Sequence, residues 1–332
     1  MTKRILNITV SVIVAVMFLW LAFRSVPFAE LWTLVKTASL WWLVPFAFVM
    51  ILSHYIRAER WRLLFPADWH LRKSTLFAGV MLGYFLNNLV PRLGEISRPV
   101  YVARRHGLSK SNMIGTIVLE RIIDIISMLF ILLFTIFFII RDADLILRIF
   151  GTQDWQWFHY AIVPAFVLFI TGGILLFYRI LVLFEKKNEL KNPYLVKIIT
   201  ITRSFGAGIV SVRNIKHWPG FILFTAFIWL SYILMTYLPF YMFDLTAEYN
   251  LTFASAVVIT VIASIGITVP TPGGLGSYHL FVQQALWIIY GVPLVTGLAY
   301  ATVTHAVMMI LIFSTTPVSL WWDKFYTLRN KK

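Results

Sequence analysis

Long apolar runs are the feature that most limits what this chain can fold into. An α-helix needs about 20 mostly apolar residues to cross a hydrocarbon core about 30 Å thick. Hydrophobic residues make up 60% of the 332 residues and charged residues only 13%, too little charge for a water-facing surface. The sequence therefore predicts an all-α integral membrane protein, with residues 1–332 forming a single membrane domain. The predicted full transmembrane helices are 5–23, 40–56, 111–140, 159–183, 219–243 and 294–322.

Two further apolar segments, within 74–98 and 251–290, are interrupted by proline and glycine. If the first crossed fully, the basic stretch from Arg92 to Lys110 would lie outside, against the positive-inside rule. The conflict disappears if this segment returns to the cytoplasmic face. Because the basic C-terminus is also expected inside, the second segment must begin and end outside. The sequence thus predicts two oppositely oriented re-entrant hairpins, about 74–98 and 251–290, beside about six full spans.

The two breaks resemble each other in sequence. Leu89–Glu95 and Thr268–Gly274 each contain the end of an apolar helix, then Val-Pro, then glycine. Opposed elements of similar sequence are typical of an inverted repeat, in which transporters hold a substrate where broken helices meet near the bilayer midplane. Two unrelated proline-terminated helices would give the same short pattern, so both interpretations stay open.

The net charge of +15 is interpreted through the membrane assignment. Basic loops hold the cytoplasmic face and contact anionic lipid, so membrane lipids are the predicted partners and nucleic acid is not. The first apolar run is expected to be an uncleaved span, with both termini cytoplasmic and the protein in the cytoplasmic (inner) membrane. The chain has no cysteine, which excludes disulfides and thiolate metal sites. Whether it forms a homo-oligomer is left open.

Three charged residues lie deep in the predicted span 111–140: Glu120, Arg121 and Asp124. At 1.5 Å per residue they sit about 15 Å into the helix, near the middle of the core. Glu120 and Asp124 share one helix face, and Arg121 points about 100° away from Glu120. Charges at this depth are costly and mark functional sites by default, so all three are predicted to bind substrate. The alternative is a buried ion-pair cluster that locks helices together.

Polar residues also surround the first break, where Pro91 stops the helix and Gly94 is predicted to allow a tight turn. Charged groups would then enter a cavity at the break, where an arginine can bind a phosphate through two hydrogen bonds. The predicted substrate-binding residues here are Asn87, Asn88, Arg92, Glu95 and Arg98. A basic cytoplasmic rim is the alternative for these arginines. A second charged group follows the second span, and it either contacts lipid headgroups or forms the same rim: Arg57, Glu59, Arg60 and Arg62.

The second break, Thr271–Ser277, is uncharged and rich in glycine. Its backbone N–H groups can face an anion, although an ordinary hairpin turn would have the same composition. Thr271, Gly273 and Gly274 are predicted to bind substrate. His305, in the last span, is added to them, with a buried hydrogen-bonded histidine as the alternative. The sequence has no Walker loop, HExxH, GxSxG or metal-spaced cluster, so no catalytic residue, metal or cofactor is predicted.

At these motifs the sequence resembles the flippase-like membrane family that includes the transmembrane domain of lysylphosphatidylglycerol synthases. The matching stretches are Asn88–Arg98, Gly107–Asp124 and Pro270–Tyr278. The chain departs from the family pattern at Tyr278 or His279, where an acidic residue is frequent, and at His305, where an arginine is familiar. The resemblance implies lipid translocation between leaflets. The lysyltransferase activity of the longer members belongs to a separate soluble domain and is not transferred.

The leading hypothesis is a flippase-like transporter, not an enzyme, that moves a phospholipid or lipid-linked phosphate headgroup between leaflets. Its arginines would bind phosphate, and Glu120 and Asp124 would balance their charge or contact an amine. Two other hypotheses stay open. One is a membrane enzyme that acts on a lipid headgroup with acidic side chains as acid–base groups. The other is a non-transporting partner of a lipid-modifying enzyme.

Overall fold

The computed structural model describes residues 2–65, 69–139, 168, 172 and 217–329. Every regular element among these residues is a helix, and they contain no strand. The predicted all-helical class is therefore confirmed for the described part of the chain. Contacts divide the chain into two compact units, Met1–Ile114 with Lys216–Lys332 and Gly115–Ile215, and each unit is described by itself.

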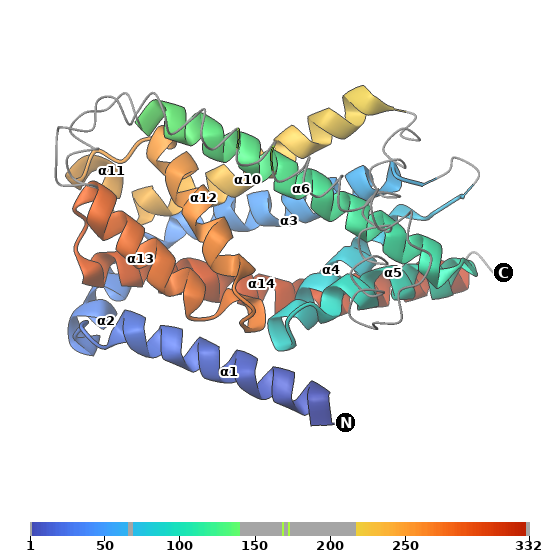
Figure 1. Cartoon of the computed structure of the whole chain (residues 1–332), viewed down its shortest axis with the longest axis horizontal. Helices are drawn as coiled ribbons and strands as arrows, with labels where there is room; N and C mark the ends of the chain where they lie inside the picture. Colours follow the sequence, from blue (N-terminus) through green and yellow to red (C-terminus); the bar gives the residue numbers. More distant parts are fainter. Residues whose placement is uncertain (1, 66–68, 140–167, 169–171, 173–216, 330–332) are drawn as a thin grey trace. The chain divides into compact units, whose positions relative to one another are not determined.

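The first unit contains most of the described helices (Figure 1). Its α-helices are α1 (Thr2–Phe23), α2 (Phe28–Thr37), α3 (Leu43–Arg62), α4 (Lys73–Leu89), α5 (Leu93–His106), α10 (Trp218–Met242), α11 (Leu245–Glu248), α12 (Phe253–Thr268), α13 (Ser277–Tyr290) and α14 (Leu294–Arg329). Two single turns of 3₁₀ helix, η1 (Leu40–Trp42) and η3 (Pro272–Gly274), complete it.

Three helical segments are long and apolar enough to cross a membrane: Leu40–Arg62, Trp218–Met242 and Leu294–Thr327. They coincide with three of the predicted spans, which supports a membrane protein with several apolar helices. A fourth span results if α1 and α2 are counted together, although Ile8–Phe23 and Phe28–Thr37 meet at 84°. Pro27 lies at this bend, where its missing N–H and fixed φ favour a break. The count of six full spans stays a prediction.

The two predicted irregular segments are both helical hairpins. The first consists of α4 and α5, separated at Val90–Arg92, and the second consists of α12 and α13, separated by η3. In Figure 1 the teal and orange hairpins point toward one another, and α4 contacts η3 at their tips. The positions of α4, α12 and α13 agree with the predicted apolar segments, whereas α5 was expected as a loop. Whether the hairpins are re-entrant depends on a membrane placement that is proposed below.

The long helix α14 packs against both hairpins, on α4 and on α13, while α3 packs along α10. A buried apolar cluster joins α3, α4 and α14 and contains Phe46, Met50, Met81 and Ile312. Lipid tails are as apolar as these side chains, so close van der Waals packing, more than removal from water, stabilises such a core within a bilayer. This packing positions the base of the first hairpin.

The structure corrects three local predictions. Helix α3 continues to Arg62, whereas the predicted span ended at residue 56, because no proline or glycine interrupts the chain before Pro66. The basic stretch after Pro91, expected as a loop, is helix α5. The segment after the first span, also expected as a loop, contains α2. In each case a stretch with charged residues was interpreted as a loop, although lysine and arginine are good helix formers.

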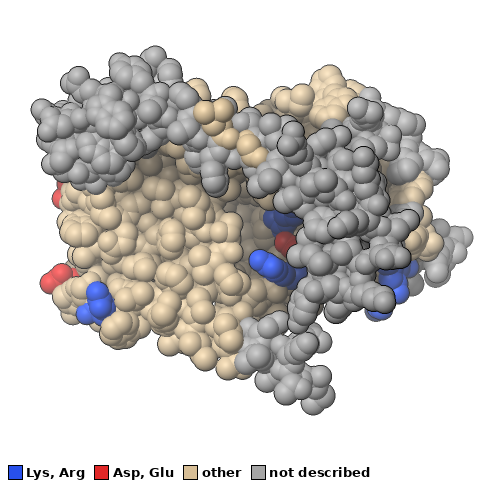
Figure 2. Space-filling model, in the orientation of Figure 1, with Lys and Arg blue, Asp and Glu red and all other residues tan. Residues whose placement is uncertain are grey.

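The described surface is largely uncharged, as Figure 2 shows for one face. Large apolar side chains are widely exposed, among them Trp41 at 77%, Phe28 at 70% and Phe48 at 67%. A soluble monomer rarely exposes so much apolar surface, whereas a lipid-facing surface needs it. The charged side chains gather at a few places on this face. Because burying a charge is costly, the charged residues that are buried are the stronger candidates for a functional site.

In the second unit the structure describes most of α6 (Lys110–Ile139), a helix of 30 residues that begins in the first unit. Its position agrees with the predicted helix 111–140. The predicted span 159–183 lies outside the described residues, apart from two isolated positions. The prediction of a single membrane domain stays a prediction.

Candidate functional site: two hairpin tips and a buried arginine

The turn of the first hairpin depends on Arg92 and on the side chain of Asn87. Arg92 has φ 65°, a left-handed conformation that is uncommon outside glycine. The Asn87 Oδ1 atom accepts a hydrogen bond of 2.7 Å from the backbone N–H of Gly94, at the start of α5. The side chain of Asn87 therefore satisfies an N–H group that the helix leaves without an intrahelical partner.

Gly94 does not form the turn that the sequence predicted. It lies inside α5, and a Cβ atom there would overlap the backbone carbonyl of Gly83 on α4. Its missing side chain lets the two helices of the hairpin touch through their backbones. At Gly79, a Cβ atom would lie 2.8 Å from the Val102 side chain, so α4 also fits closely against α5 there. The first hairpin is thus a closely packed pair.

The second tip is built from glycines with positive φ and from hydroxyl groups. Gly273, Gly274 and Gly276 have φ values of 59°, 78° and 83°, which side-chain-bearing residues rarely adopt. The Thr271 and Ser277 hydroxyl oxygens lie 3.1 Å apart, and Ser277 Oγ donates to the Gly274 carbonyl at 3.2 Å. These bonds hold the turn from inside, so Thr271 has a structural partner.

The two tips meet at Asn88 and Gly273. A Cβ atom at Gly273 would overlap Oδ1 of Asn88, so the asparagine side chain lies directly on the glycine. Nε2 of His305 lies 2.9 Å from the Gly273 carbonyl oxygen, and buried polar groups are normally paired in this way. The structure thus brings together Asn88, Gly273 and His305, three of the residues predicted to bind substrate.

Two more aromatic side chains surround His305. The ring centroids of His279 and His305 are 4.9 Å apart, and the Tyr278 ring is stacked on His305 at 5.5 Å. The Tyr278 hydroxyl lies 3.1 Å from Oγ1 of Thr304, and all of these side chains are buried. The second tip therefore rests on a small buried polar core that these four side chains form, and none of them is Asp, Glu, Lys or Arg.

Arg98 is the buried cation of the first hairpin. It lies on α5 with 7% of its surface exposed, and its guanidinium carbon sits 4.0 Å from the centroid of the Trp61 ring. A Cβ atom on Gly83 would lie 3.2 Å from the Arg98 Cβ, so α4 fits closely against this side chain. A desolvated guanidinium over an indole gains about 2 kcal/mol, which fixes the orientation of Arg98.

Helix α3 adds two arginines, for which the sequence left open contact with lipid headgroups or a position on a basic cytoplasmic rim. Arg57 and Arg60 are 5% and 0% exposed. The Arg57 Nη2 atom donates to the Tyr232 hydroxyl at 2.6 Å, and Arg60 Nη1 lies 3.3 Å from Oγ1 of Thr225. The rim prediction is therefore wrong for both. The three-residue spacing, which places both arginines on one helix face, was the signal that could have found them.

The other residues of this basic stretch differ from one another in exposure. Glu59 is 7% exposed and forms ion pairs of 2.9 Å with Arg62 and 3.2 Å with Lys73.

At the first tip, Arg92 is exposed and Glu95 is half-buried. The structure therefore does not bury Arg92 beside Arg98, although the two were predicted to act together.

On α6, the three charged residues have different surroundings. Glu120 is 2% exposed, Asp124 is half-buried, and Arg121 is exposed. This alternation agrees with the predicted helix faces, with Glu120 and Asp124 on one side and Arg121 on another. These residues belong to the second unit, and their substrate-binding role stays a prediction.

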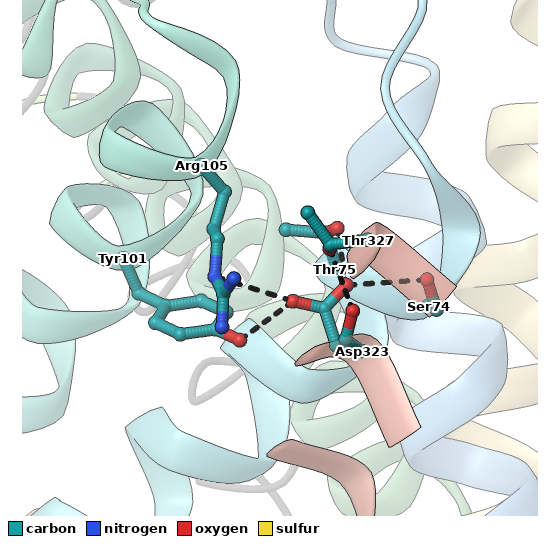
Figure 3. A network of polar contacts seen from close by, with 6 residues as sticks. All are labelled: Ser74, Thr75, Tyr101, Arg105, Asp323 and Thr327. Carbon is teal, nitrogen blue, oxygen red and sulfur yellow. Dashed lines mark hydrogen bonds and ion pairs between the residues drawn. The ribbon is translucent and has the colours of Figure 1, made fainter. Parts of the chain in front are cut away.

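A polar network around Asp323 escaped the sequence analysis (Figure 3). Asp323 lies on α14 and is fully buried. Its Oδ1 atom accepts from Thr75 at 2.5 Å and Ser74 at 3.2 Å, and its Oδ2 atom accepts from Tyr101 at 2.7 Å. Nε of Arg105 lies 3.5 Å from Oδ2. The sequence signal was a single carboxylate near the end of an apolar helix, which needs partners to be buried.

This network attaches both helices of the first hairpin to α14. Burial, with the hydrogen bond to Asp323, raises the pKa of Tyr101 to about 12. The neutral phenol therefore remains the donor to the carboxylate at physiological pH. Among the described residues, no group of three or more His, Asp or Glu side chains is placed to hold a metal ion.

Comparisons with known proteins place the chain among membrane proteins. The family model described as the lysylphosphatidylglycerol synthase TM region matches residues 8–314. The UPF0104 membrane protein MJ1595 of Methanocaldococcus jannaschii is 31% identical over 98 residues, which cover 28% of this chain and 29% of that relative. No solved structure matches the chain. Because the family model covers nearly its whole length, the protein belongs to the family of the lysylphosphatidylglycerol synthase TM region.

Proposed function

We propose that this protein translocates a phospholipid or a lipid-linked phosphate between the leaflets of the cytoplasmic membrane. Membership of a family named for the membrane region of a lipid synthase supports a role in handling lipid. The uncharged exposed surface supports direct contact with lipid tails. Translocation, as opposed to another use of the lipid, is inferred from the geometry of the hairpins.

The contact between the two hairpin tips is the observation that carries the proposal. Helices α5 and α13 have 14 residues each, which is about 21 Å of helix and shorter than a hydrocarbon core of about 30 Å. Hairpins of this length that meet tip to tip fit a placement in which each enters from one face and ends inside the bilayer. They would then be the two re-entrant halves of an inverted repeat, with both termini cytoplasmic.

In this proposal, Arg98 contacts the phosphate group. A charged headgroup costs several kcal/mol at the centre of a bilayer, so a pathway needs a fixed opposite charge on the way. Arg98 is held close behind the first tip by Trp61 and supplies such a charge. Arg92 would meet the phosphate at the exposed end of the hairpin. Arg121, Glu120 and Asp124 keep their predicted roles in binding phosphate and in balancing its charge.

The second tip supplies neutral contacts. Asn88 and the glycine backbone can exchange hydrogen bonds with a headgroup as it passes, while Thr271 holds the turn from inside and His305 fixes the Gly273 carbonyl. The tails stay in the bilayer throughout, and no covalent step is needed. The protein is thus proposed to be a transporter whose partners are membrane lipids.

A liposome assay tests this function. Purified full-length protein should move fluorescent phosphatidylglycerol or polyprenyl phosphate between leaflets, as measured by the fraction of probe that an external quencher reaches. Arg98→Met should lower the initial rate by about tenfold or more, because a hydrogen-bonded charge contact is lost. Arg104→Met, on an exposed position of the same helix, should leave the rate unchanged.

Two results would contradict the proposal. One is no translocation of anionic, zwitterionic or polyprenyl lipid by folded protein. The other is equal rates for Arg98→Met, Arg104→Met and the unchanged chain. Mass spectrometry of the extracted lipid belongs to the same experiment, since a chemically altered headgroup would favour a membrane enzyme instead.

A further inference from the structure

His54, on α3, is a buried imidazole that the proposed function does not use. It is 5% exposed, and its ring lies 4.3 Å from the ring of Tyr84 on α4, centroid to centroid. Neither ring nitrogen has a hydrogen-bond partner in the part of the chain that the structure describes. The great majority of buried polar side-chain atoms in proteins have a hydrogen-bond partner, so an imidazole whose two nitrogens have none needs an explanation.

The positive charges of Arg57 and Arg98 both act on His54. Arg57 lies one turn further along α3, and Arg98 comes from α5. Each guanidinium also has an uncharged aromatic neighbour, Tyr232 for Arg57 and Trp61 for Arg98. These neighbours help to orient the two guanidinium groups. The imidazole therefore lies beside cations that come from two separate helices.

An anion with several oxygen atoms fits these donors. A guanidinium presents a planar set of N–H groups that matches phosphate, and an imidazole N–H adds a donor of another direction. Such bonds are about twice as strong as neutral ones. A metal ion does not fit, because Arg57 and Arg98 are both cations and His54 would be a single ligand.

We propose that His54, Arg57 and Arg98 form a binding site for the phosphate group of a membrane lipid. The inference rests on the proposed function and extends it, because it adds two residues of α3 to the path of the headgroup. Helix α3 is one of the apolar helices long enough to span the membrane, so a lipid reaches this site more directly than a soluble phosphate does.

The site is closed in this structure, since all three side chains are at most 7% exposed. Two of its walls, Tyr84 on α4 and Arg98 on α5, belong to the first hairpin. Movement of that hairpin away from α3 would open the site on one side, while His54 and Arg57 stay on α3. Phosphate binding is therefore linked to the position of the first hairpin.

Binding to the purified full-length chain in detergent tests the site separately from translocation. The probes are dioctanoyl phosphatidylglycerol, dioctanoyl phosphatidic acid, inorganic phosphate and, as a phosphate-free control, dioctanoylglycerol. His54→Phe keeps a ring beside Tyr84 and removes both nitrogens, and it should weaken binding of both phospholipids about tenfold. His70→Phe, at an exposed histidine, should leave binding of both phospholipids unchanged. The affinity for dioctanoylglycerol should be the same for the unchanged chain and both variants.

Thermal unfolding of each variant identifies a folding defect. If His54→Phe does not fold, His54→Gln takes its place, because it keeps a neutral polar side chain and should still weaken phospholipid binding severalfold. Equal phospholipid affinity in folded His54 variants and the unchanged chain would overturn the site. Binding of inorganic phosphate without either phospholipid would overturn its assignment to lipid. Lipid binding that depends on His54 without any translocation would retain the site and reject the transport function.

Discussion

The two hairpins meet tip to tip but are built in different ways. The first carries a buried arginine and joins its helices through glycine-to-backbone contact. The second has no charged residue from Phe253 to Tyr290, and hydroxyl groups and a histidine support its turn. The difference teaches that two hairpins in contact can contribute different chemistry. In the proposed transport, the first would supply charge for a headgroup, and the second would supply a fixed neutral surface.

The largest expected effect comes from the glycine that joins α4 and α5. Gly94→Ala places a methyl group on the Gly83 carbonyl and should lower the free energy of unfolding by about 3 kcal/mol, because backbone cannot move aside easily. In the second hairpin, Gly266→Ala meets the side chain of Phe281 at 3.1 Å and should cost about 1 kcal/mol. Thermal unfolding in detergent measures both.

A control for this pair is Gly115→Ala on α6, where a Cβ atom has no neighbour within 4 Å. Alanine is the better helix former by about 1 kcal/mol, so this variant should be neutral or slightly more stable. Equal losses in Gly94→Ala and Gly266→Ala would remove the distinction between the two hairpins.

The next effect concerns the contact between the tips. Gly273→Ala forces a side chain into φ 59° and against Asn88, at a cost of about 2 kcal/mol. Asn88→Ala removes the obstructing oxygen, so the double variant should recover about half of the lost stability. A double-mutant cycle of unfolding free energies measures this coupling. Strictly additive losses would mean that the tips do not touch.

A smaller loss is expected where the first hairpin is attached to α14. Asp323→Asn replaces an acceptor-only carboxylate by an amide and should cost about 1.5 kcal/mol, since the donors from Thr75 and Tyr101 compete for one good acceptor. Asp244→Asn serves as the control, because Asp244 is exposed and has φ 53°, which asparagine tolerates. If the two variants unfold at the same temperature, the Asp323 network contributes no stability.

The smallest effect is a pH dependence at Tyr101. Its pKa is about 12 in the folded chain, above the ordinary value of 10.0, through burial and the bond to Asp323. The folded state therefore holds the proton more tightly, and this contribution is complete below pH 10 and lost as the pH rises toward 12. Tyr101→Phe should flatten the fall in unfolding temperature over that window, whereas Tyr326→Phe, at an exposed tyrosine, should retain it.

The sequence predicted most of the apolar helices and both breaks because those signals are local. Apolar length marked the regions of α10 and α14, and Pro91 and Pro272 marked the tips. It failed where charge was taken as evidence of solvent. A cytoplasmic rim was one of the two expectations for Arg57 and Arg60. They are buried instead, because Tyr232 and Thr225, more than 160 residues away, provide polar partners.

Other parts of the site depend on contacts that no local pattern encodes. The sequence around Gly94 is typical of a turn glycine, but its function is to let α5 approach the backbone of Gly83. The residue with positive φ in the turn is Arg92. His54 and Asp323 belong to no recognisable motif in the sequence. Their neighbours come from other helices, so only the fold identifies them.

A pair of cysteines at the tips tests the central claim most directly, because the chain has no other cysteine. A Cβ atom on Gly273 lies 3.3 Å from the Cα of Asn88, which suits a disulfide between Asn88→Cys and Gly273→Cys. If a headgroup passes between the tips, oxidation should stop lipid translocation in liposomes and dithiothreitol should restore it. Complete disulfide formation with an unchanged translocation rate would contradict the account.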